Sequence, residues 1–562
     1  MSVNEFDFLI VGGGTAGCTL ANRLSADPTT RVALFEAGPP DASAKIRIPA
    51  AVAAAIADKR FAWGYKSVPQ RHLNRRELPL PRGRVLGGCS SINGMVYFRG
   101  HPRDFDDWAA SGARGWGFAD VLPYFRLSEN NERWQASTLH GVGGPMNVTD
   151  IVRPNPLNQR FLEAARSLGF KRCEDFAGLD PEGFNLRQAT IRRGRRESMV
   201  TAFLNPARPR ANLSVVTDAT VARVLIEGGH AKGVEVLRAG QSEIFRARRD
   251  VILSAGAYGS PQVMLLSGVG PGNALQKLGI PVQRDLAGVG VGLHDHPATS
   301  LQVRTSDPTS YGLSLRALPR GIRNILEYGL AHRGPLASNV FEATGFVRTN
   351  DQYDRPDLQL VFMPAHRNAS GFPIPLGHGF GIVVISVRPL SRGSVQLASP
   401  DPHAAPLIDP NFLEHPRDLR TLVAGAKLSR RLLGAPAFQG LRGVELSPGP
   451  NVRDDDSWRS YIRNSLVTVH HPCSTCRMGV DALAVVDSDL RVRGVTGLRV
   501  ADASVFPAVV AGNSNAAVVM VAERAADLIL GKPVLAPETD ALERMGYQLS
   551  TGDPALTRSG TS

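Results

Sequence analysis

The chain has 562 residues, of which 43% are hydrophobic and 20% are charged, and this composition excludes a disordered or fibrous protein. Its length exceeds one ordinary hydrophobic core, so we expect two domains or one large elaborated domain. The 64 basic residues outnumber the 51 acidic residues and give a net charge of +13. Such a balance is compatible with nucleic acid, an anionic membrane surface or an acidic partner.

The distribution of charge argues against nucleic acid as a partner. The densest basic cluster lies at 192–196, and it lacks interleaved aromatic residues and any recognisable nucleic-acid module. Peripheral contact with an anionic membrane surface stays open. The most apolar long stretch, Ala516 to Leu530, carries three charged residues, so we expect no membrane-spanning segment.

Cysteine usage favours a reducing compartment and no metal. The five cysteines form no disulfide framework, and the first predicted strand begins too close to Met1 for a secretory leader. We expect a cytoplasmic protein, with peripheral attachment at the inner membrane surface as the alternative. Cys473 and Cys476 resemble half of a zinc-deaminase signature, but no histidine begins an H-x-E and no second C-x-x-C exists.

The start of the chain reads as a dinucleotide-binding unit. The apolar run Phe8 to Val11 predicts a buried strand, an amphipathic helix follows, and Val32 to Phe35 predict a second strand. Between strand and helix lies a G-x-G-x-x-G motif made of Gly12, Gly14 and Gly17. These glycines permit a tight turn, the approach of a pyrophosphate to the backbone, and close packing of helix against strand.

Glu36 closes this unit at the end of the second strand. Its carboxylate suits a ribose with a free 2′-hydroxyl and would repel a 2′-phosphate. The unit therefore predicts a site for FAD or NAD, and the motif alone does not separate these two cofactors.

Four segments, met in order along the chain, resemble the glucose-methanol-choline (GMC) oxidoreductase family. After the N-terminal unit come PRGRVLGGCSSING at 81–94, GAYGSPQVMLLSGVG at 256–270, and a C-terminal quarter with VTVHHPCSTCRMG at 467–479. The small residues at 87–91 suit backbone that lies against a flat ligand. The resemblance covers residues 4 to about 533 and implies FAD as the cofactor.

The resemblance implies an α/β fold, α+β overall, in which a Rossmann-like FAD-binding domain is interleaved with a substrate domain on a mainly antiparallel sheet. The expected FAD-binding domain comprises 1–155, 210–300 and 462–533, and the expected substrate-binding domain comprises 156–209 and 301–461. Residues 534–562 are polar, contain prolines and lack periodicity, so we expect a surface tail there.

The resemblance also implies the cofactor contacts. It places Ser90, Asn93 and Gly94 near the flavin ring, the backbone of Val221 at the adenine, and Asp502 on the other flank of the FAD. The full set of expected cofactor residues is Gly12, Gly14, Thr15, Ala16, Gly17, Glu36, Arg84, Gly88, Ser90, Asn93, Gly94, Val221 and Asp502. Ile92 stands where several family members attach flavin through a histidine, so we predict non-covalent FAD.

The resemblance places the active-site histidine at His471 and its partner at Asn513. A histidine with an ordinary pKa of about 6.5 takes the hydroxyl proton of an alcohol near neutral pH. The amide of Asn513 donates to the oxygen while the carbon faces flavin N5. His471 is therefore the expected catalytic base, and Val469 and His470 are expected to shape the substrate pocket. Asn513, Ser514 or Asn515 are expected to cap a helix that ends at Gly531.

The sequence indicates the substrate class less specifically than it indicates the cofactor. Segments at 334–349 and 376–402 resemble the bacterial alcohol and choline dehydrogenase branch, and Glu342 matches a pocket carboxylate that choline-oxidising relatives use against a quaternary ammonium. No sequence feature supplies the aromatic cage that choline binding favours. We expect oxidation of a primary aliphatic or aromatic alcohol to the aldehyde, by a dehydrogenase more than by an oxidase. The electron acceptor is a quinone, a dye or O2.

Several alternatives accompany this expectation. Choline is the second substrate candidate, for a dehydrogenase or an oxidase. The family also contains lyases that keep FAD without redox turnover and photodecarboxylases that use FAD as a photosensitiser, and a protein that merely binds FAD is a further class. Bleaching of the flavin by a substrate separates the oxidoreductase from the other three.

Overall fold

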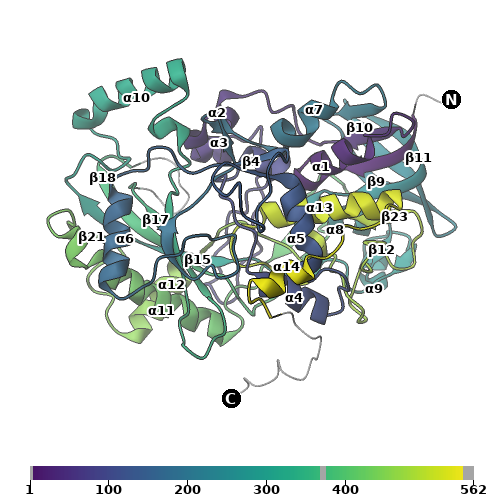
Figure 1. Ribbon diagram of the computed structural model, residues 1–562. Helices are drawn as coiled ribbons and strands as arrows, with labels where there is room; N and C mark the ends of the chain where they lie inside the picture. Colours follow the sequence, from purple (N-terminus) through teal and green to yellow (C-terminus); the bar gives the residue numbers. More distant parts are fainter. Residues whose placement is uncertain (1–3, 367–374, 549–562) are drawn as a thin grey trace.

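The computed structural model describes residues 4–366 and 375–548, which form two large sheets with helices around them (Figure 1). The first sheet has the strand order β8-β2-β1-β11-β10-β9, with β23 paired to β11. Its strands are β1 (Glu5–Val11), β2 (Val32–Phe35), β8 (Leu213–Val216), β9 (Thr220–Glu227), β10 (His230–Arg238), β11 (Gln241–Leu253) and β23 (Leu498–Val500). The β8, β2, β1, β11 and β23 pairings are parallel, and β9, β10 and β11 pair antiparallel.

The N-terminal unit forms as the sequence predicts. Strand β1 runs into helix α1 (Thr15–Leu24), and β2 occupies the four residues predicted for the second strand. A Cβ atom on Gly17 would lie 1.9 Å from the carbonyl oxygen of Gly12, so only glycine allows α1 to pack this closely on the turn.

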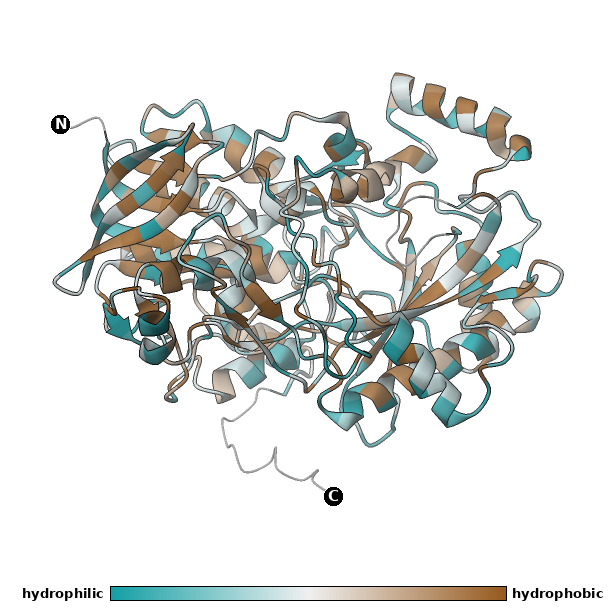
Figure 2. Ribbon diagram, turned by 180° about the vertical axis from the view of Figure 1, so that it is seen from behind, coloured by the Kyte–Doolittle hydropathy of each residue, from teal (hydrophilic) through white to brown (hydrophobic). Residues whose placement is uncertain are grey.

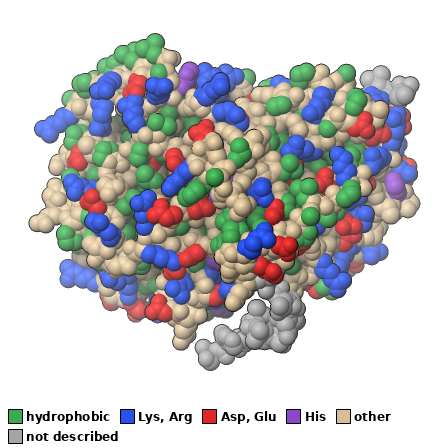
Figure 3. Space-filling model, in the orientation of Figure 1, with side chains coloured by type: hydrophobic (Ala, Val, Ile, Leu, Met, Phe, Trp, Pro, Cys, Tyr) green, Lys and Arg blue, Asp and Glu red, His purple; other side chains and the backbone are tan. Residues whose placement is uncertain are grey.

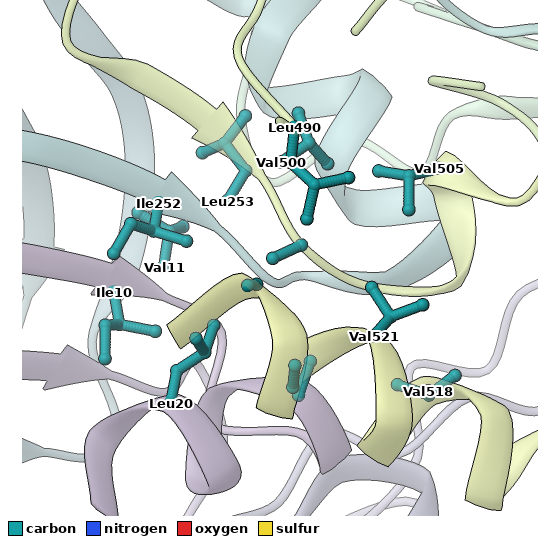
Figure 4. Packing of buried hydrophobic residues seen from close by; sticks show 14 of the residues in the cluster. Ile10, Val11, Leu20, Ile252, Leu253, Leu490, Val500, Val505, Val518 and Val521 are labelled. Carbon is teal, nitrogen blue, oxygen red and sulfur yellow. The ribbon is translucent and has the colours of Figure 1, made fainter. Parts of the chain in front are cut away.

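Two helices from opposite ends of the chain cover the first sheet. Helix α13 (Asn515–Leu530) lies beside α1, and Arg23 of α1 donates two hydrogen bonds to the buried carboxylate of Glu523. Figure 4 shows the apolar layer between sheet and helices, to which the strands contribute Val11 and Ile252, helix α1 contributes Leu20 and helix α13 contributes Val521. This core holds the two ends of the chain in one unit.

The second sheet is antiparallel throughout, with the order β21-β15-β18-β17-β16-β5 and β22 paired to β15. Its strands are β5 (Gly183–Leu186), β15 (Pro297–Thr305), β16 (Ala343–Val347), β17 (Leu358–Met363), β18 (His378–Ser386), β21 (Glu445–Ser447) and β22 (Val467–Thr468). A mixed sheet whose N-terminal strands are parallel, beside a wholly antiparallel sheet, agrees with the predicted α/β fold class.

The chain crosses between the sheets more often than the expected segments imply. Strand β15 begins within 210–300, and β22 lies within 462–533, yet both belong to the second sheet. Conversely, Met199 to Ala207 pack into the core of the first sheet. Each sheet is thus assembled from stretches that are far apart in sequence.

The second sheet has one covered face and one open face. Helices α11 (Pro416–Leu433) and α12 (Asp455–Ser465) pack on one side, α11 against β17 and α12 against β15, and Leu358, Leu360 and Phe362 of β17 belong to the core on that side. The alternate residues Gln359, Val361 and Met363 line a cavity on the other side. Because side chains alternate along a strand, the same strand builds the core and the cavity wall.

Part of the expected surface tail packs against the helices and core that cover the first sheet. Residues Thr539–Arg544 form helix α14, Leu542 is fully buried, and Arg126 of α5 (Phe118–Ser128) bonds to Glu538. Apolar and charged contacts therefore fix this stretch up to residue 548, in place of the free surface tail that its polar composition predicted, and the rest of the tail lies outside the described residues. Within the described residues, no helix is both long and apolar enough to cross a membrane.

Candidate active site

A cavity of about 520 Å³ lies between the two sheets. At one end it is lined by Gly12, Gly14 and Glu36 of the N-terminal unit, and at the other by His471 and Asn513. Most of the cofactor residues predicted from the sequence and the predicted catalytic pair therefore border the same cavity.

Ten of the expected cofactor residues line the cavity: Gly12, Gly14, Thr15, Ala16, Glu36, Gly88, Asn93, Gly94, Val221 and Asp502. Three do not, because each is engaged elsewhere. Gly17 packs α1 on the turn, Arg84 lies over the ring of Trp63 at 5.1 Å, and the Ser90 hydroxyl donates to the Gly87 carbonyl oxygen. These three residues do not line the cavity and instead support the residues that do.

Glu36 has the geometry expected of a ribose-binding carboxylate. Its two oxygens accept backbone hydrogen bonds from Gly13 at 3.0 Å and Gly38 at 2.8 Å, which fix its orientation at the end of β2. Burial raises the pKa of this carboxyl to about 7, and the two backbone donors oppose that shift. A ribose hydroxyl would supply a further donor to this partly desolvated group.

The residues present fit a dinucleotide such as FAD. The N-termini of α1 and α13 meet at the cavity, where Thr15 donates a hydrogen bond to Asn515, and such termini favour phosphate or other negative charge. A Cβ on Gly14 would meet no atom closer than 3.9 Å, which leaves space for a pyrophosphate against the backbone. Ile92 lines the cavity and offers no nitrogen for covalent attachment.

His471 lies in a loop held between two pairings. Thr468 of β22 pairs with Pro297, and Cys473 pairs with His294, so the intervening residues bulge toward the cavity. The turn brings His470 into the left-handed region at φ 68°. The fold of this loop, rather than its sequence alone, directs both histidines into the cavity.

Asp295 fills the space behind the bulge. Its buried carboxylate accepts the hydroxyl of Thr468 at 2.6 Å and the backbone amides of His471 at 2.7 Å and His296 at 2.8 Å. Burial raises the pKa of Asp295 to about 6 against these donors. Asp295 therefore fixes the backbone of the candidate base.

Both ring nitrogens of His471 have partners. Nε2 lies 2.9 Å from Nδ2 of Asn513, and Nδ1 lies 3.0 Å from Nδ1 of His296. Burial, with His296, His470 and Arg82 nearby, lowers the pKa of His471 well below its ordinary value, so the ring is neutral. An amide nitrogen only donates, so Nε2 accepts and Nδ1 carries the proton that it donates to His296.

This arrangement suits an alcohol whose oxygen replaces the direct contact between His471 and Asn513 and bonds to both side chains. The unprotonated Nε2 accepts the hydroxyl proton, while the amide of Asn513 donates to the same oxygen.

Helix α13 begins at Asn515, and none of the expected side chains caps it. Ser514, one of the three expected residues, occupies the N-cap position, but its side chain makes no capping hydrogen bond, while Asn513 bonds to His471 and Asn515 accepts from Thr15.

Val469 and His470 line the cavity as expected, but Glu342 does not. Its fully buried carboxylate accepts from the Asn155 amide, the Asn158 side chain, the Tyr311 hydroxyl and the Ser338 hydroxyl. Four donors from three segments satisfy its oxygens, so it ties β16 to the loops around it rather than facing a substrate.

Sequence reasoning missed Arg187, which lines the cavity from the end of β5 and is only 4% exposed. Its Nε donates to the Phe341 carbonyl oxygen at 2.5 Å, and the guanidinium lies about 6 Å from the rings of Phe98 and Phe341. No carboxylate of the described residues forms an ion pair with it. His296 and Asp295 were also missed, although the pattern HDHP at 294–297 signals them.

Comparison with known proteins agrees with this geometry. The models of the GMC oxidoreductase N-terminal and C-terminal regions match residues 6–298 and 389–522. The chain is 40% identical to an alcohol dehydrogenase [acceptor] of Pseudomonas putida, over 94% of this chain and 96% of that protein. It is 43% identical to an oxygen-dependent choline dehydrogenase of Rhizobium etli, over 95% and 97%.

Solved structures of oxidases also match this fold over most of the chain. The pyridoxine 4-oxidase from Mesorbium loti superposes with a TM-score of 0.84 at 32% identity, covering 94% of this chain and all of that one. A formate oxidase superposes with a TM-score of 0.88 at 30% identity, covering 94% and 98%.

Proposed function

Because the chain belongs to the GMC oxidoreductase family, whose cofactor is FAD, we propose that it oxidises a primary aliphatic or aromatic alcohol to the aldehyde. The observation that carries this proposal is the neutral His471 ring, whose Nε2 lies 2.9 Å from the Asn513 amide at the cavity, where one alcohol oxygen can bond to both groups. Bound FAD supplies the acceptor for the hydrogen and electron pair that leave the alcohol carbon.

The protein residues handle the proton and the oxygen. His471 Nε2 takes the hydroxyl proton as the C–H bond breaks, and the Asn513 amide stabilises the negative charge that develops on oxygen. The C–O bond becomes a carbonyl, and the proton stays on the imidazole until solvent or the next step removes it.

His296 acts as a positioning residue for this base. By accepting the Nδ1 proton of His471, it keeps the lone pair on Nε2, where the substrate hydroxyl lies. Without that acceptor the proton could occupy either nitrogen, and only one tautomer accepts a proton from the alcohol.

The charges around the cavity favour an uncharged alcohol over choline. Among the described residues that line it, Arg82 and Arg187 are positive, while Glu36 and Asp502 lie with the dinucleotide motifs. Burial lowers the pKa of Arg187 only to about 9, so it is a cation at neutral pH and repels a quaternary ammonium. The Glu342 carboxylate, which would attract choline, is satisfied by four neutral donors.

We further propose a dehydrogenase that delivers electrons to a quinone or dye more readily than to O2. The support is the similarity over nearly the whole chain to the Pseudomonas putida alcohol dehydrogenase [acceptor]. The choline dehydrogenase relatives keep choline as the second candidate substrate.

The test is anaerobic mixing of the yellow protein with primary alcohols, benzyl alcohol, choline and glucose, while the visible flavin band is recorded. We expect bleaching by a primary alcohol and none by choline, and slow return of colour in air. An Arg187→Met variant should gain reduction by choline relative to benzyl alcohol. Bleaching by choline alone would overturn the substrate assignment, and no bleaching at all would favour the lyase or photochemical classes.

A further inference from the structure

Helix α10 (Leu318–Ala331) stands away from the body of the molecule (Figure 1, upper left). Of its 14 residues, only Tyr328 is buried. Its large apolar side chains are exposed instead: Leu318 57%, Ile322 52%, Ile325 64%, Leu326 58% and Leu330 87%. In the preceding turn η4 (Leu315–Ala317), Leu315 is 89% exposed.

These side chains lie on one face of the helix. Positions 318, 322, 325, 326 and 330 follow the spacing of an amphipathic helix, which in a globular protein turns that face toward the core. Here the face, which we call the α10 apolar face, points to solvent and is visible as an apolar area at the upper left of Figure 3. Figure 2 shows the molecule from behind, where hydrophobic and more polar residues alternate along the ribbon of this helix.

Positive charge borders this face. Arg316, Arg323 and Arg333 are exposed, and none of them forms an ion pair with a carboxylate of the described residues. The one acidic residue of α10, Glu327, already pairs with Arg153. The helix therefore presents a row of leucine and isoleucine side chains next to free cations.

We propose that α10 is a membrane-docking helix that lies in the interface of a bilayer containing anionic lipid. A strongly amphipathic helix with arginines beside its apolar face binds such interfaces by apolar burial together with attraction to anionic headgroups. At 1.5 Å per residue it is about 21 Å long, shorter than the roughly 30 Å hydrocarbon core, so it lies on the membrane and does not span it.

The charges favour lipid over a second copy of the chain. A two-fold interface brings the same surface of both copies together, so the arginines beside the α10 apolar face would meet those of the partner copy without acids to pair them. An anionic headgroup layer supplies the missing negative charge.

The position of α10 relates this surface to the active site. The helix continues into η5 (Pro335–Ala337), which packs against η1 (Pro49–Ala51). Asn339, Val340 and Phe341, just beyond η5, line the cavity. Docking through α10 would hold this side of the cavity wall near the membrane, where apolar alcohols and quinones concentrate.

Vesicle sedimentation of the FAD-loaded protein tests the proposal without any substrate, so its outcome is independent of the alcohol assignment. We expect the protein to sediment with vesicles of phosphatidylcholine mixed with phosphatidylglycerol, and much less with phosphatidylcholine alone or at high salt. An Ile322→Ser/Ile325→Ser variant should lose this binding at least about tenfold. Ile244→Ser, which changes an exposed isoleucine on β11, should bind like the wild type.

The variants remain interpretable because both changed side chains are already in solvent, and flavin content and turnover of a water-soluble alcohol report intact folding. Absence of wild-type binding, equal binding to neutral vesicles, or unchanged binding by the double variant would each overturn the proposal. A wild-type dimer that becomes a monomer in the double variant, with no vesicle binding by either, would instead assign the α10 apolar face to self-association.

Discussion

The Nε2 atom of His471 carries no proton and accepts a hydrogen bond from Asn513, so a His471→Ala variant removes the proposed base and tests its chemical role. We expect the rate of flavin reduction by alcohol to fall by about 10² to 10⁴, the usual contribution of a positioned general base. Stopped-flow recording of the flavin band measures this rate. FAD content should stay at the wild-type level, and an unchanged reduction rate would remove His471 from the mechanism.

The pH dependence follows from the lowered pKa of His471. The base works only when unprotonated, and a pKa below its ordinary value of about 6.5 keeps it unprotonated at lower pH. The reduction rate should therefore hold as pH falls to about 6.5, and its acid limb should lie below that value. An acid limb above pH 7 would contradict the direction of this shift.

The contact between His296 and His471 predicts a difference between two substitutions at position 296. In His296→Asn the side-chain oxygen still accepts the Nδ1 proton of His471, whereas His296→Leu offers no acceptor. We expect the leucine variant to lose roughly 10- to 100-fold in kcat, as seen when orienting partners of ligating imidazoles are removed, with KM nearly unchanged.

The asparagine variant should recover most of that loss, and the pH profile of the leucine variant should shift because its imidazole tautomer is no longer fixed. Equal losses in both variants, or a loss confined to FAD content, would mean that His296 serves only in packing.

At the scale of elements, the β1–α1 turn predicts a strict requirement for glycine. A methyl group at Gly17 would meet the Gly12 carbonyl oxygen at 1.9 Å, so α1 must shift away from β1. Overpacking of this kind costs roughly 1–3 kcal/mol, and the shift would also displace the helix N-terminus from the pyrophosphate position. Gly17→Ala should therefore lower both FAD retention on gel filtration and the denaturant midpoint.

Gly321→Ala is the matched control for that change. Gly321 lies in α10, and an added Cβ there meets no atom within 4 Å. The control should keep its FAD and gain slightly in helix stability. If Gly17→Ala retained FAD as firmly as the control, the close packing of α1 would not be required for cofactor binding.

At the scale of the whole molecule, the two sheets enclose the cavity without a histidine at position 92, so FAD should be held by shape and hydrogen bonds alone. Unfolding in urea or acid opens both sheets, and the yellow colour should then pass an ultrafiltration membrane that retains the protein. Colour that stays with the polypeptide would demonstrate a covalent bond at another residue.

The sequence determined the cofactor unit because its information is local. A strand, a glycine turn, a helix and a second strand follow one another within 6–36, and each glycine is required by the backbone beside it. For the same reason the segments around His471 and Asn513 could be recognised, and both residues line the cavity. The FAD-binding α/β fold followed from these motifs taken in order.

The tertiary structure decided which distant side chains meet. His296 and His471 are 175 residues apart, and their contact depends on the pairing of β15 with β22. By sequence Glu342 matches a pocket carboxylate, but in the fold its oxygens accept hydrogen bonds from Asn155 and Asn158. No local sequence pattern indicated that Arg187 lines the cavity. Such contacts depend on sheet register and loop path, which no local pattern specifies.

The same distinction holds for α10. The spacing of its apolar residues predicts an amphipathic helix, but this spacing indicates only that one face of the helix is apolar. Whether that face meets a core, a partner or a membrane depends on where the rest of the chain packs. In this protein the neighbouring segments leave it in solvent, and only the three-dimensional arrangement reveals that.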